Sequence, residues 1–353
     1  MRESREYPGP VREPFELVPA GGSVPALLSR MQTSAFQGRK LGEAFDGWRR
    51  MIDGGGLICL GLAGSLASAG LAPLVAWLVD RRYVDLVVST SANATEDLLE
   101  ERGVPFYQVD PDHVDDAELW RKGFYRFYDH VVSAVEYDRM EDFLGGFFEH
   151  LAATWPAPTI TGARFMHELG RWLDGQGLGR SLAATCFRAG VPLFVPAAPD
   201  GPISEGYRIA RAKGPVVDFY RDYEVALRIM GRWMAPERGT GAIFLGGGVP
   251  KDFIQITATS VCAIRGAVEP TPHLAAIQIT TDSTVFGGLG GASVATECIS
   301  WGKESPSGNN VMVFADVTIA LPVICQGLLE AYGVDHRRRT RDDVRGEITR
   351  LLD

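Results

Sequence analysis

Six short apolar segments recur along the chain, and each one ends in a stretch of small or polar residues. They lie at residues 57–60, 86–89, 192–195, 242–245, 276–280 and 311–314. A short apolar run without alternation is typical of a strand that is buried on both faces. Segments with helical spacing lie between these runs. The pattern therefore predicts an α/β fold with a mostly parallel sheet and helices on both of its faces.

The helical segments are marked by apolar residues at spacings of three and four. In residues 27–52, Leu41, Phe45, Trp48 and Ile52 form one such face. We expect further helices at residues 66–79, 140–153 and 162–173, and a charged terminal helix at 337–352. The aromatic residues between 104 and 180 are expected to pack a core.

The domain organisation is predicted from the composition of the N-terminal residues and from the continuity of the rest of the chain. Residues 1–22 are charged and proline-containing, which predicts a poorly ordered N-terminal arm. Residues 23–353 contain no repeat and no long linker. We therefore expect a single domain there.

Composition excludes several classes of protein. The chain has 353 residues with 46% hydrophobic and 22% charged content, which is ordinary for a globular protein, and its net charge of −9 argues against nucleic-acid binding. Glycine and proline interrupt the apolar run 57–79, so we expect a buried strand–turn–helix unit and no membrane span. The five scattered cysteines predict free thiols in a reducing, cytoplasmic setting. No spacing of cysteine, histidine or acidic residues predicts a metal site.

The turn after the first predicted strand, residues 61–65, is Gly-Leu-Ala-Gly-Ser. Small residues at such a turn let a phosphate approach backbone N–H groups at a helix N-terminus. The turn lacks a complete G-x-G-x-x-G pattern, so a plain tight turn is the simpler interpretation of this segment alone. The loops after the other strands are also small or polar, and ligands bind beyond the carboxyl ends of parallel strands. Together they predict a ligand site at that edge of a Rossmann-like sheet.

A lysine follows a Trp-Gly pair at residues 301–303. Taken alone, such a lysine is most simply a solvated surface residue. The alternative is that Trp301 forms an apolar wall that favours the neutral, nucleophilic amine of Lys303. Glu297 opposes this effect because a nearby carboxylate favours the ammonium form. Several more carboxylates lie near the predicted strand ends, which suits a cationic substrate such as a polyamine.

Residues 297–303, Glu-Cys-Ile-Ser-Trp-Gly-Lys, resemble the active-site segment of deoxyhypusine synthases. The resemblance extends over residues 27–332 and includes 61–70, 84–98, 193–201, 243–251 and 313–322 in the family's order. It implies that NAD takes a hydride from spermidine and that an aminobutyl fragment passes to the lysine as a Schiff base. The fragment then passes to an acceptor amine, and the same cofactor returns the hydride.

The resemblance also implies roles for individual residues. Lys303 would be the nucleophile, Trp301 the wall of the amine channel, and Glu96, Glu205 and Glu297 the acids that bind the amine substrate. The residues that would bind NAD are Gly64, Ser65, Ser68, Thr90, Ser91, Ala92, Asp200, Gly247, Asp282, Ser283, Ala315 and Asp316. The family further implies a homotetramer whose sites lie at a dimer interface.

Three places on the amine side depart from the family's pattern, one of which is Thr95-Glu96, where the family has paired acids. Asp252 stands where the family has a catalytic histidine, and Gly290 stands where it has an acid. We keep Asp252 among the expected substrate-binding residues. These departures favour an aminobutyl-type transferase that acts on a polyamine or diamine with a small-amine acceptor, as in homospermidine synthases. The main alternative is a deoxyhypusine synthase that modifies a lysine of a translation factor. A net amine dehydrogenase and a non-catalytic NAD or polyamine binder are further alternatives, and Lys303 argues against both.

Overall fold

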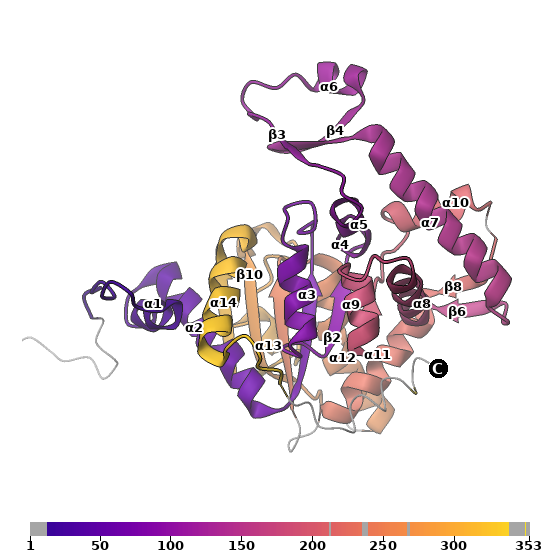
Figure 1. Cartoon of the computed structure of the whole chain (residues 1–353). Helices are drawn as coiled ribbons and strands as arrows, with labels where there is room; N and C mark the ends of the chain where they lie inside the picture. Colours follow the sequence, from indigo (N-terminus) through magenta and orange to yellow (C-terminus); the bar gives the residue numbers. More distant parts are fainter. Residues whose placement is uncertain (1–12, 212, 235–238, 267–268, 339–349, 351–353) are drawn as a thin grey trace, which may run out of the picture.

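The computed structural model of the chain describes residues 13–211, 213–234, 239–266, 269–338 and 350. A six-stranded sheet lies at its centre, in the order β11-β10-β9-β1-β2-β7 (Figure 1). The strands are β1 (Leu57–Leu62), β2 (Leu86–Ser89), β7 (Leu193–Phe194), β9 (Thr240–Leu245), β10 (His273–Thr280) and β11 (Glu304–Phe314). Every neighbouring pair is parallel. The predicted parallel sheet is confirmed, and each predicted strand is present.

Helices cover both faces of the sheet because alternate side chains of each strand enter different cores. In β1, Ile58 and Leu60 belong to one core, whereas Leu57 and Cys59 belong to the other. The first core is packed by α2 (Phe36–Gly54), α3 (Ala72–Asp80), α9 (Leu182–Ala189) and α14 (Val317–Tyr332), and the second by α11 (Phe219–Trp233) and α12 (Gly248–Arg265). This double burial is the reason that the strands read as continuous apolar runs.

The order of the strands identifies the type of sheet. Numbered along the chain, the six central strands lie in the order 3-2-1-4-5-6, with β9 returning to the side of β1 opposite β2. This is the order of the doubly wound dinucleotide-binding fold, in which the winding reverses next to the first strand. The loops after β1 and β9 therefore diverge and leave a crevice at the carboxyl edge of the sheet.

Smaller elements lie outside the central sheet. The strands β3 (Tyr107–Gln108), β4 (Phe124–Phe127) and β5 (His130–Ser133) form an antiparallel sheet that, with α6 (Asp116–Lys122), projects from the body in Figure 1. The helix α7 (Ala134–Thr154) leads back from it to α10 (Pro202–Ile209). The strands β6 (Thr159–Thr161) and β8 (Val216–Asp218) pair in parallel. The remaining helices are α1 (Val24–Gln32), α4 (Ser91–Thr95), α5 (Asp97–Glu101), α8 (Gly162–Gly175), α13 (Glu297–Ser300) and the 3₁₀ turn η1 (Thr284–Phe286).

Several predicted helices have different bounds. The segment 27–52 is two helices, α1 and α2, separated by residues 33–35. The helix predicted at 66–79 begins only at Ala72, because Gly70 turns the chain with a φ of 73° and Pro73 suits a first helical turn. The helices α7 and α8 contain the predicted segments 140–153 and 162–173. In the predicted terminal helix, residues 337 and 338 are not helical, and nearly all of the rest lies outside the described residues.

Other sequence-based expectations have mixed outcomes. The five cysteines are free, as predicted. Phe147 and Phe148 are buried as expected, whereas Trp120 is exposed on the projecting unit. The part of the predicted arm that is described, residues 13–22, contains no helix or strand. Among the described helices, none is both long and apolar enough to cross a bilayer.

Candidate active site and cofactor cleft

A cleft of about 290 Å³ opens at the carboxyl edge of the sheet, where the loops after β1 and β9 diverge. Four of the predicted cofactor residues line it together: Gly64, Gly247, Asp282 and Asp316. Thr280 and Thr318 also line the cleft and were not singled out in the sequence, because lone threonines at strand and helix ends carry no specific signal. Ser283 and Ala315 flank lining residues without lining the cleft themselves.

The turn after β1 is held in place by Asn93, a buried residue that the sequence did not single out. Its Oδ1 accepts hydrogen bonds from the N–H groups of Leu66 at 2.6 Å and Ala67 at 3.1 Å. Its Nδ2 and the Thr90 hydroxyl both donate to the carbonyl oxygen of Gly64, at 3.0 and 2.7 Å. The backbone of the turn is therefore held in one conformation by side chains from the segment that follows β2.

Glu96 lies behind this turn and not in an open channel. Its Oε2 accepts a hydrogen bond from the Ser65 hydroxyl, and its Oε1 accepts one from the Tyr137 hydroxyl at 2.9 Å. Burial and the neighbouring Glu96 carboxylate raise the pKa of Tyr137. Ser68 in turn donates to the carbonyl of Ser65 at 2.9 Å. In this chain Glu96 thus fastens the turn to α7, and its predicted role in binding an amine stays a prediction.

The loop after β7 contacts α4 at the remaining predicted cofactor residues. A Cβ atom at Gly201 would lie 2.7 Å from the Ser91 hydroxyl, so only glycine permits this approach. Ser91 is buried and Asp200 is exposed next to Gly201. Ser91, Ala92 and Asp200 do not line the cleft. Ser91 and Ala92 directly follow Thr90, whose hydroxyl bonds to Gly64 of the cleft.

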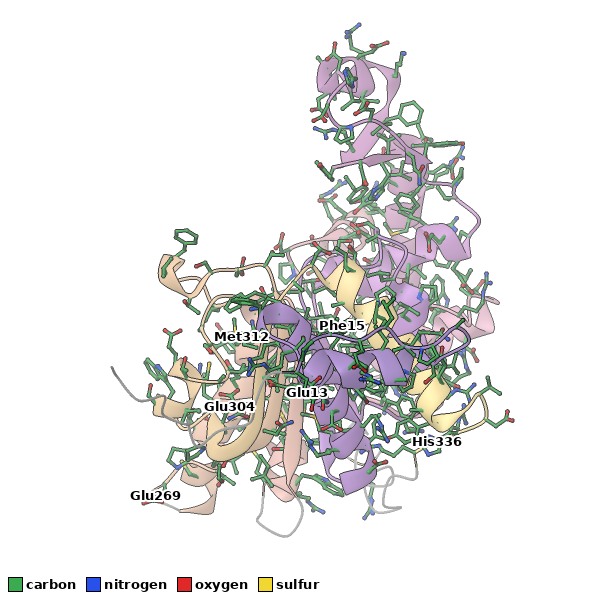
Figure 2. All side chains as sticks on the ribbon, turned by 90° about the vertical axis from the view of Figure 1, so that its left-hand side faces the viewer. Glu13, Phe15, Glu269, Glu304, Met312 and His336 are labelled. Atoms are coloured by element: carbon green, nitrogen blue, oxygen red, sulfur yellow. The ribbon has the colours of Figure 1, made fainter. Side chains whose placement is uncertain are left out.

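Lys303 lies at the amino end of β11, whereas the predicted cofactor loops lie at carboxyl strand ends. Its carbonyl accepts a hydrogen bond at 2.9 Å from the N–H of His273, the first residue of β10. In Figure 2, Glu304 and Met312 mark the lower and upper parts of β11. The Lys303 side chain nevertheless reaches the first turns of α12, where its Nζ lies 2.6 Å from Asp252 Oδ1.

This ion pair joins two of the predicted site residues, and both side chains are partly shielded, with exposures of 17% for Lys303 and 33% for Asp252. The Asp252 carboxylate therefore contacts the Lys303 ammonium directly. The same carboxylate is positioned to accept a proton from it. A pocket of about 370 Å³ that Asp252 lines together with Tyr223 and Phe253 provides apolar space beside the pair.

Trp301 does not enclose Lys303 within one chain. Its side chain is 69% exposed, and the Lys303 Nζ lies 5.8 Å from the ring centre, a distance compatible with a cation–π contact. The expected desolvating wall is therefore incomplete in the single chain. Glu297 is exposed, and its Oε2 accepts a hydrogen bond from the N–H of Ser293 at 3.1 Å.

A buried polar cluster next to the ion pair was not predicted, because charged side chains are seldom buried. Glu304 is 0% exposed, and its Oε1 accepts a hydrogen bond from Gln255 Nε2 at 2.5 Å. Its Oε2 has no hydrogen-bond partner among the described residues. Burial raises the pKa of Glu304 to about 7 and also raises the pKa of the Cys298 thiol. Burial lowers the pKa of Lys251 in the same cluster.

Glu205 lies on α10 and pairs with Arg208, with its Oε2 2.6 Å from the arginine Nε. Its charge adds to desolvation in raising the pKa of Glu141 on the neighbouring α7. Among the described residues, no hydrogen bond or ion pair joins Glu96 or Glu205 to Lys303. One chain thus holds the predicted residues in separate groups: the cleft, the Lys303–Asp252 pair, and the acids of α4–α5 and α10.

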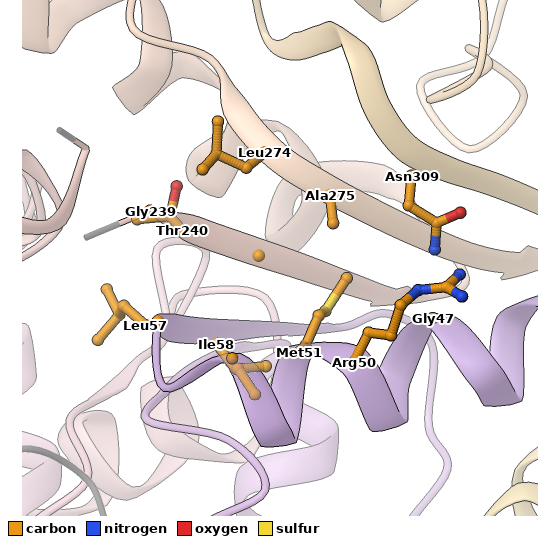
Figure 3. A pocket seen from close by; sticks show the side chains of 13 residues that line it. Gly47, Arg50, Met51, Leu57, Ile58, Gly239, Thr240, Leu274, Ala275 and Asn309 are labelled. Atoms are coloured by element: carbon orange, nitrogen blue, oxygen red, sulfur yellow. The ribbon is translucent and has the colours of Figure 1, made fainter. Parts of the chain in front are cut away.

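A second cavity and the grouping of possible metal ligands concern regions outside the cofactor cleft and the Lys303–Asp252 pair. A cavity of about 270 Å³ lies at the amino ends of β1 and β9, lined in part by Met51, Thr240, Leu274 and Asn309 (Figure 3), and it contains none of the predicted site residues. In the described part of the chain, no three histidine, cysteine or acidic side chains are grouped to hold a metal ion.

The doubly wound strand order, with a cleft at the point where the winding reverses, defines an α/β protein with a Rossmann-like fold. The sequence comparisons then give the family. The chain belongs to the deoxyhypusine synthase family, whose sequence model matches residues 26–328. Membership of this family indicates a transferase that carries out an aminobutyl-transfer reaction.

Individual relatives agree with this assignment. The chain is 35% identical over 300 residues to the "Probable deoxyhypusine synthase 2" of Archaeoglobus fulgidus, covering 85% of this chain and 96% of the relative. It is 30% identical over 302 residues to the "Deoxyhypusine synthase-like protein" of Elusimicrobium minutum, covering 85% and 78%. The crystal structure of a candidate deoxyhypusine synthase from Entamoeba histolytica has the same fold, with a TM-score of 0.60 at 16% identity over 91% of this chain and 96% of that one.

Proposed function

We propose that the protein is an NAD-dependent aminobutyl transferase in which Lys303 carries the transferred fragment. The observation that carries the proposal is the Lys303–Asp252 pair, with Nζ and Oδ1 2.6 Å apart, in the family's lysine segment. Asp252 lies four residues after the first residue of α12, the helix that begins directly at the cleft. The lysine and the cofactor cleft are therefore connected through one short stretch of chain.

The cleft has the donor set that a dinucleotide needs. Gly246, Gly247 and Gly248 present backbone without side chains, so a phosphate can approach closely. The Asp282 carboxylate can accept hydrogen bonds from ribose hydroxyl groups. The N-terminus of the 16-residue helix α14 faces the cleft at Val317, and its dipole favours a pyrophosphate. NAD bound there would supply hydride acceptance and return.

Asp252 and Lys303 would perform the transfer step. Asp252 accepts a proton from the ammonium, and the neutral Lys303 amine attacks the imine carbon of the oxidised donor. A bond forms between that carbon and Nζ, the bond to the donor's remaining amine breaks, and that amine leaves with a proton. The acceptor amine then attacks the lysine imine in the same way and releases Lys303.

For the acceptor we propose a lysine of a protein, as in a deoxyhypusine synthase. The names of the relatives favour this alternative over the homospermidine interpretation from the sequence. A small amine is the second candidate acceptor, and one observation favours it: Asp252 occupies the place of the family's catalytic histidine and is paired with Lys303. The two candidates differ only in the last attack on the lysine imine.

We also propose a homotetramer with sites at a dimer interface. Two features of the single chain support this. Trp301 is 69% exposed beside Lys303, and Glu205 is not connected to the lysine. A second chain laid over Trp301 would complete the apolar wall and bring further acids to the site.

The first experiment is chemical trapping of the lysine imine. The protein, NAD and spermidine, without acceptor, are treated with borohydride, and the peptides are analysed by mass. We expect one reduced aminobutyl adduct on Lys303, and Lys303→Arg should lower transfer on the order of a thousandfold, because a guanidinium does not form the imine. NAD binding should persist in this variant.

Lys122→Arg, a surface lysine on α6 paired with Glu118, is the matched control and should trap normally. An adduct on a different lysine, or near-normal transfer by Lys303→Arg, would contradict the proposed function. Adding either a diamine or a lysine-bearing substrate protein before the borohydride then tells which acceptor discharges the adduct.

A further inference from the structure

We propose that Lys251 is a positioning residue that, together with Gln278, holds the glycine-rich loop at residues 287–292 against the cofactor cleft and so controls dinucleotide affinity. The inference rests on the proposed NAD dependence. It assigns a role to two buried side chains that take no part in the transfer step described above.

Lys251 is a buried cation whose donors are all used. Its side chain is 1% exposed, and its Nζ donates to Gln278 Oε1 at 2.9 Å, to the Leu289 carbonyl at 3.1 Å and to the Ala292 carbonyl. An ammonium has three N–H donors, so the three acceptors satisfy it. An unpaired buried ammonium would be strongly unfavourable, and these contacts are what offsets its desolvation.

Gln278 extends the same network to the loop after β9. It is fully buried in the centre of β10, and its Nε2 donates to the Gly246 carbonyl at 2.9 Å and to the Gly290 carbonyl at 2.7 Å. The two side chains thus bind carbonyls of both loops. Gly246 lines the cleft directly, which places the network immediately beneath it.

The two loops touch at backbone distance. A Cβ atom at Gly247 would lie 2.3 Å from the Cα of Gly290. Gly290 in turn lies under Asp282, since a Cβ there would meet the Asp282 carboxylate. The position of Gly290 therefore sets the positions of two cleft residues, Gly247 and Asp282.

A polar clamp is needed because this loop has little else to hold it. Residues 287–291 are Gly-Gly-Leu-Gly-Gly, and Leu289 is exposed. Fixing each residue costs about 1–2 kcal/mol of conformational entropy, and glycine loses the most. With almost no side chains to pack, the loop can be held only through its backbone groups, and Lys251 and Gln278 bind three of its carbonyls.

The clamp lies next to the reactive pair. Consecutive residues of a helix point about 100° apart, and Lys251 contacts the glycine-rich loop whereas Asp252 contacts Lys303. The same helical turn therefore supports the cleft and the lysine. This arrangement explains how a bound cofactor and the lysine keep a defined relative position.

The test removes the clamp in two different ways. Lys251→Met keeps the length of the side chain and removes its donors. Gln278→Glu keeps an acceptor for Lys251 and removes the donors to Gly246 and Gly290. Thr257→Val is the matched control, because Thr257 is buried on the same helix and its hydroxyl bonds to Ile254 and Met230, away from the glycine-rich loop.

Two quantities are measured for each folded variant: amide hydrogen exchange of residues 287–292 without cofactor, and the dissociation constant for NAD. We expect both clamp variants to speed loop exchange at least tenfold and to weaken NAD binding at least tenfold, while Thr257→Val changes neither. Saturating NAD should slow loop exchange again in the clamp variants.

The outcomes separate this inference from the proposed function. If the wild-type protein binds no NAD, the proposed function fails, and the exchange data alone still decide whether the clamp orders the loop. If wild-type and clamp variants bind NAD equally and exchange alike, the clamp is wrong and the proposed function stands. If Lys251→Met does not fold, loop exchange and NAD affinity are compared between Gln278→Glu and the wild type instead.

Discussion

At the scale of single residues, the neighbours of Lys303 matter more than its motif. The motif predicted a nucleophile behind a tryptophan wall. In the structure the tryptophan is exposed and the closest partner is Asp252, 51 positions away along the chain. Asp252 was chosen from the sequence only because a histidine is missing there. Its pairing with Lys303 gives that substitution a chemical meaning.

Glu304 gives a pH-dependent prediction at the same scale. Burial raises its pKa from 4.5 to about 7 in the folded protein, so the folded state binds the proton more tightly than the unfolded state. Its contribution to stability is therefore fully present below about pH 4.5 and is lost as the pH rises through 7. The loss is on the order of 3 kcal/mol. Glu304→Gln cannot ionise and should not show it.

The measurement is the free energy of unfolding by denaturant between pH 4.5 and 8. Glu304→Gln should gain stability relative to the wild type as the pH rises across this range. Glu297→Gln, an exposed neighbour, is the control and should follow the wild type. Parallel curves for Glu304→Gln and the wild type would show that Glu304 titrates normally.

At the scale of elements, the turn after β1 shows how a strand end becomes a binding surface. Apolar periodicity predicted the strand and the helix, but placed the start of the helix several residues too early. The extra residues form a turn that Asn93 and Thr90 hold from the end of β2. Parallel pairing of β1 with β2 brings these side chains to the turn.

The prediction for the turn after β1 concerns Gly64. It has a φ of 64°, and the position of its Cβ is open toward the cleft. Gly64→Leu should weaken NAD binding at least tenfold, because the side chain would enter the space of the cofactor. The left-handed backbone adds a strain of about 1 kcal/mol that lowers stability as well.

The strain is separated from the blocking effect by Gly103→Leu. Gly103 has a φ of 78°, has open space around its Cβ, and does not line the cleft. Titration calorimetry with NAD should show normal affinity in this variant despite a similar loss of thermal stability. Equal NAD affinities for the Gly64 and Gly103 variants would place the cofactor elsewhere.

At the scale of the whole molecule, large apolar side chains that are exposed in the single chain predict an oligomer. Phe286 is 86% exposed and Trp301 69% exposed in the single chain. Burying each of these side chains in an interface would contribute about 1.5–3 kcal/mol to association. We expect light scattering to give the mass of a homotetramer, or of a homodimer at least, at micromolar concentration. A monomer mass over the full concentration range would refute shared sites.

Local sequence patterns were sufficient to predict the α/β class, the six central strands and the family. These depend on local patterns: strands buried on both faces are continuous apolar runs, and the Trp-Gly-Lys segment is contiguous. The helices α1–α3, α7 and α8 were predicted with approximate bounds, whereas α9 to α12 and α14 were not predicted by range. The projecting antiparallel unit was missed because its strands are short and only partly buried. Most of the expected cleft residues follow strands, so the topology could group them.

Which side chains contact one another became known from the three-dimensional fold. Lys303 with Asp252, Asn93 with the turn after β1, and Lys251 with Gln278 all join residues that are 26 to 51 positions apart. Such contacts depend on strand order and on where each helix starts, and no local pattern records them. For the same reason, the burial of Lys251 and Glu304 was not predictable. A charged side chain is expected at the surface unless the fold supplies hydrogen-bond partners for it in the interior, and the sequence does not show those partners.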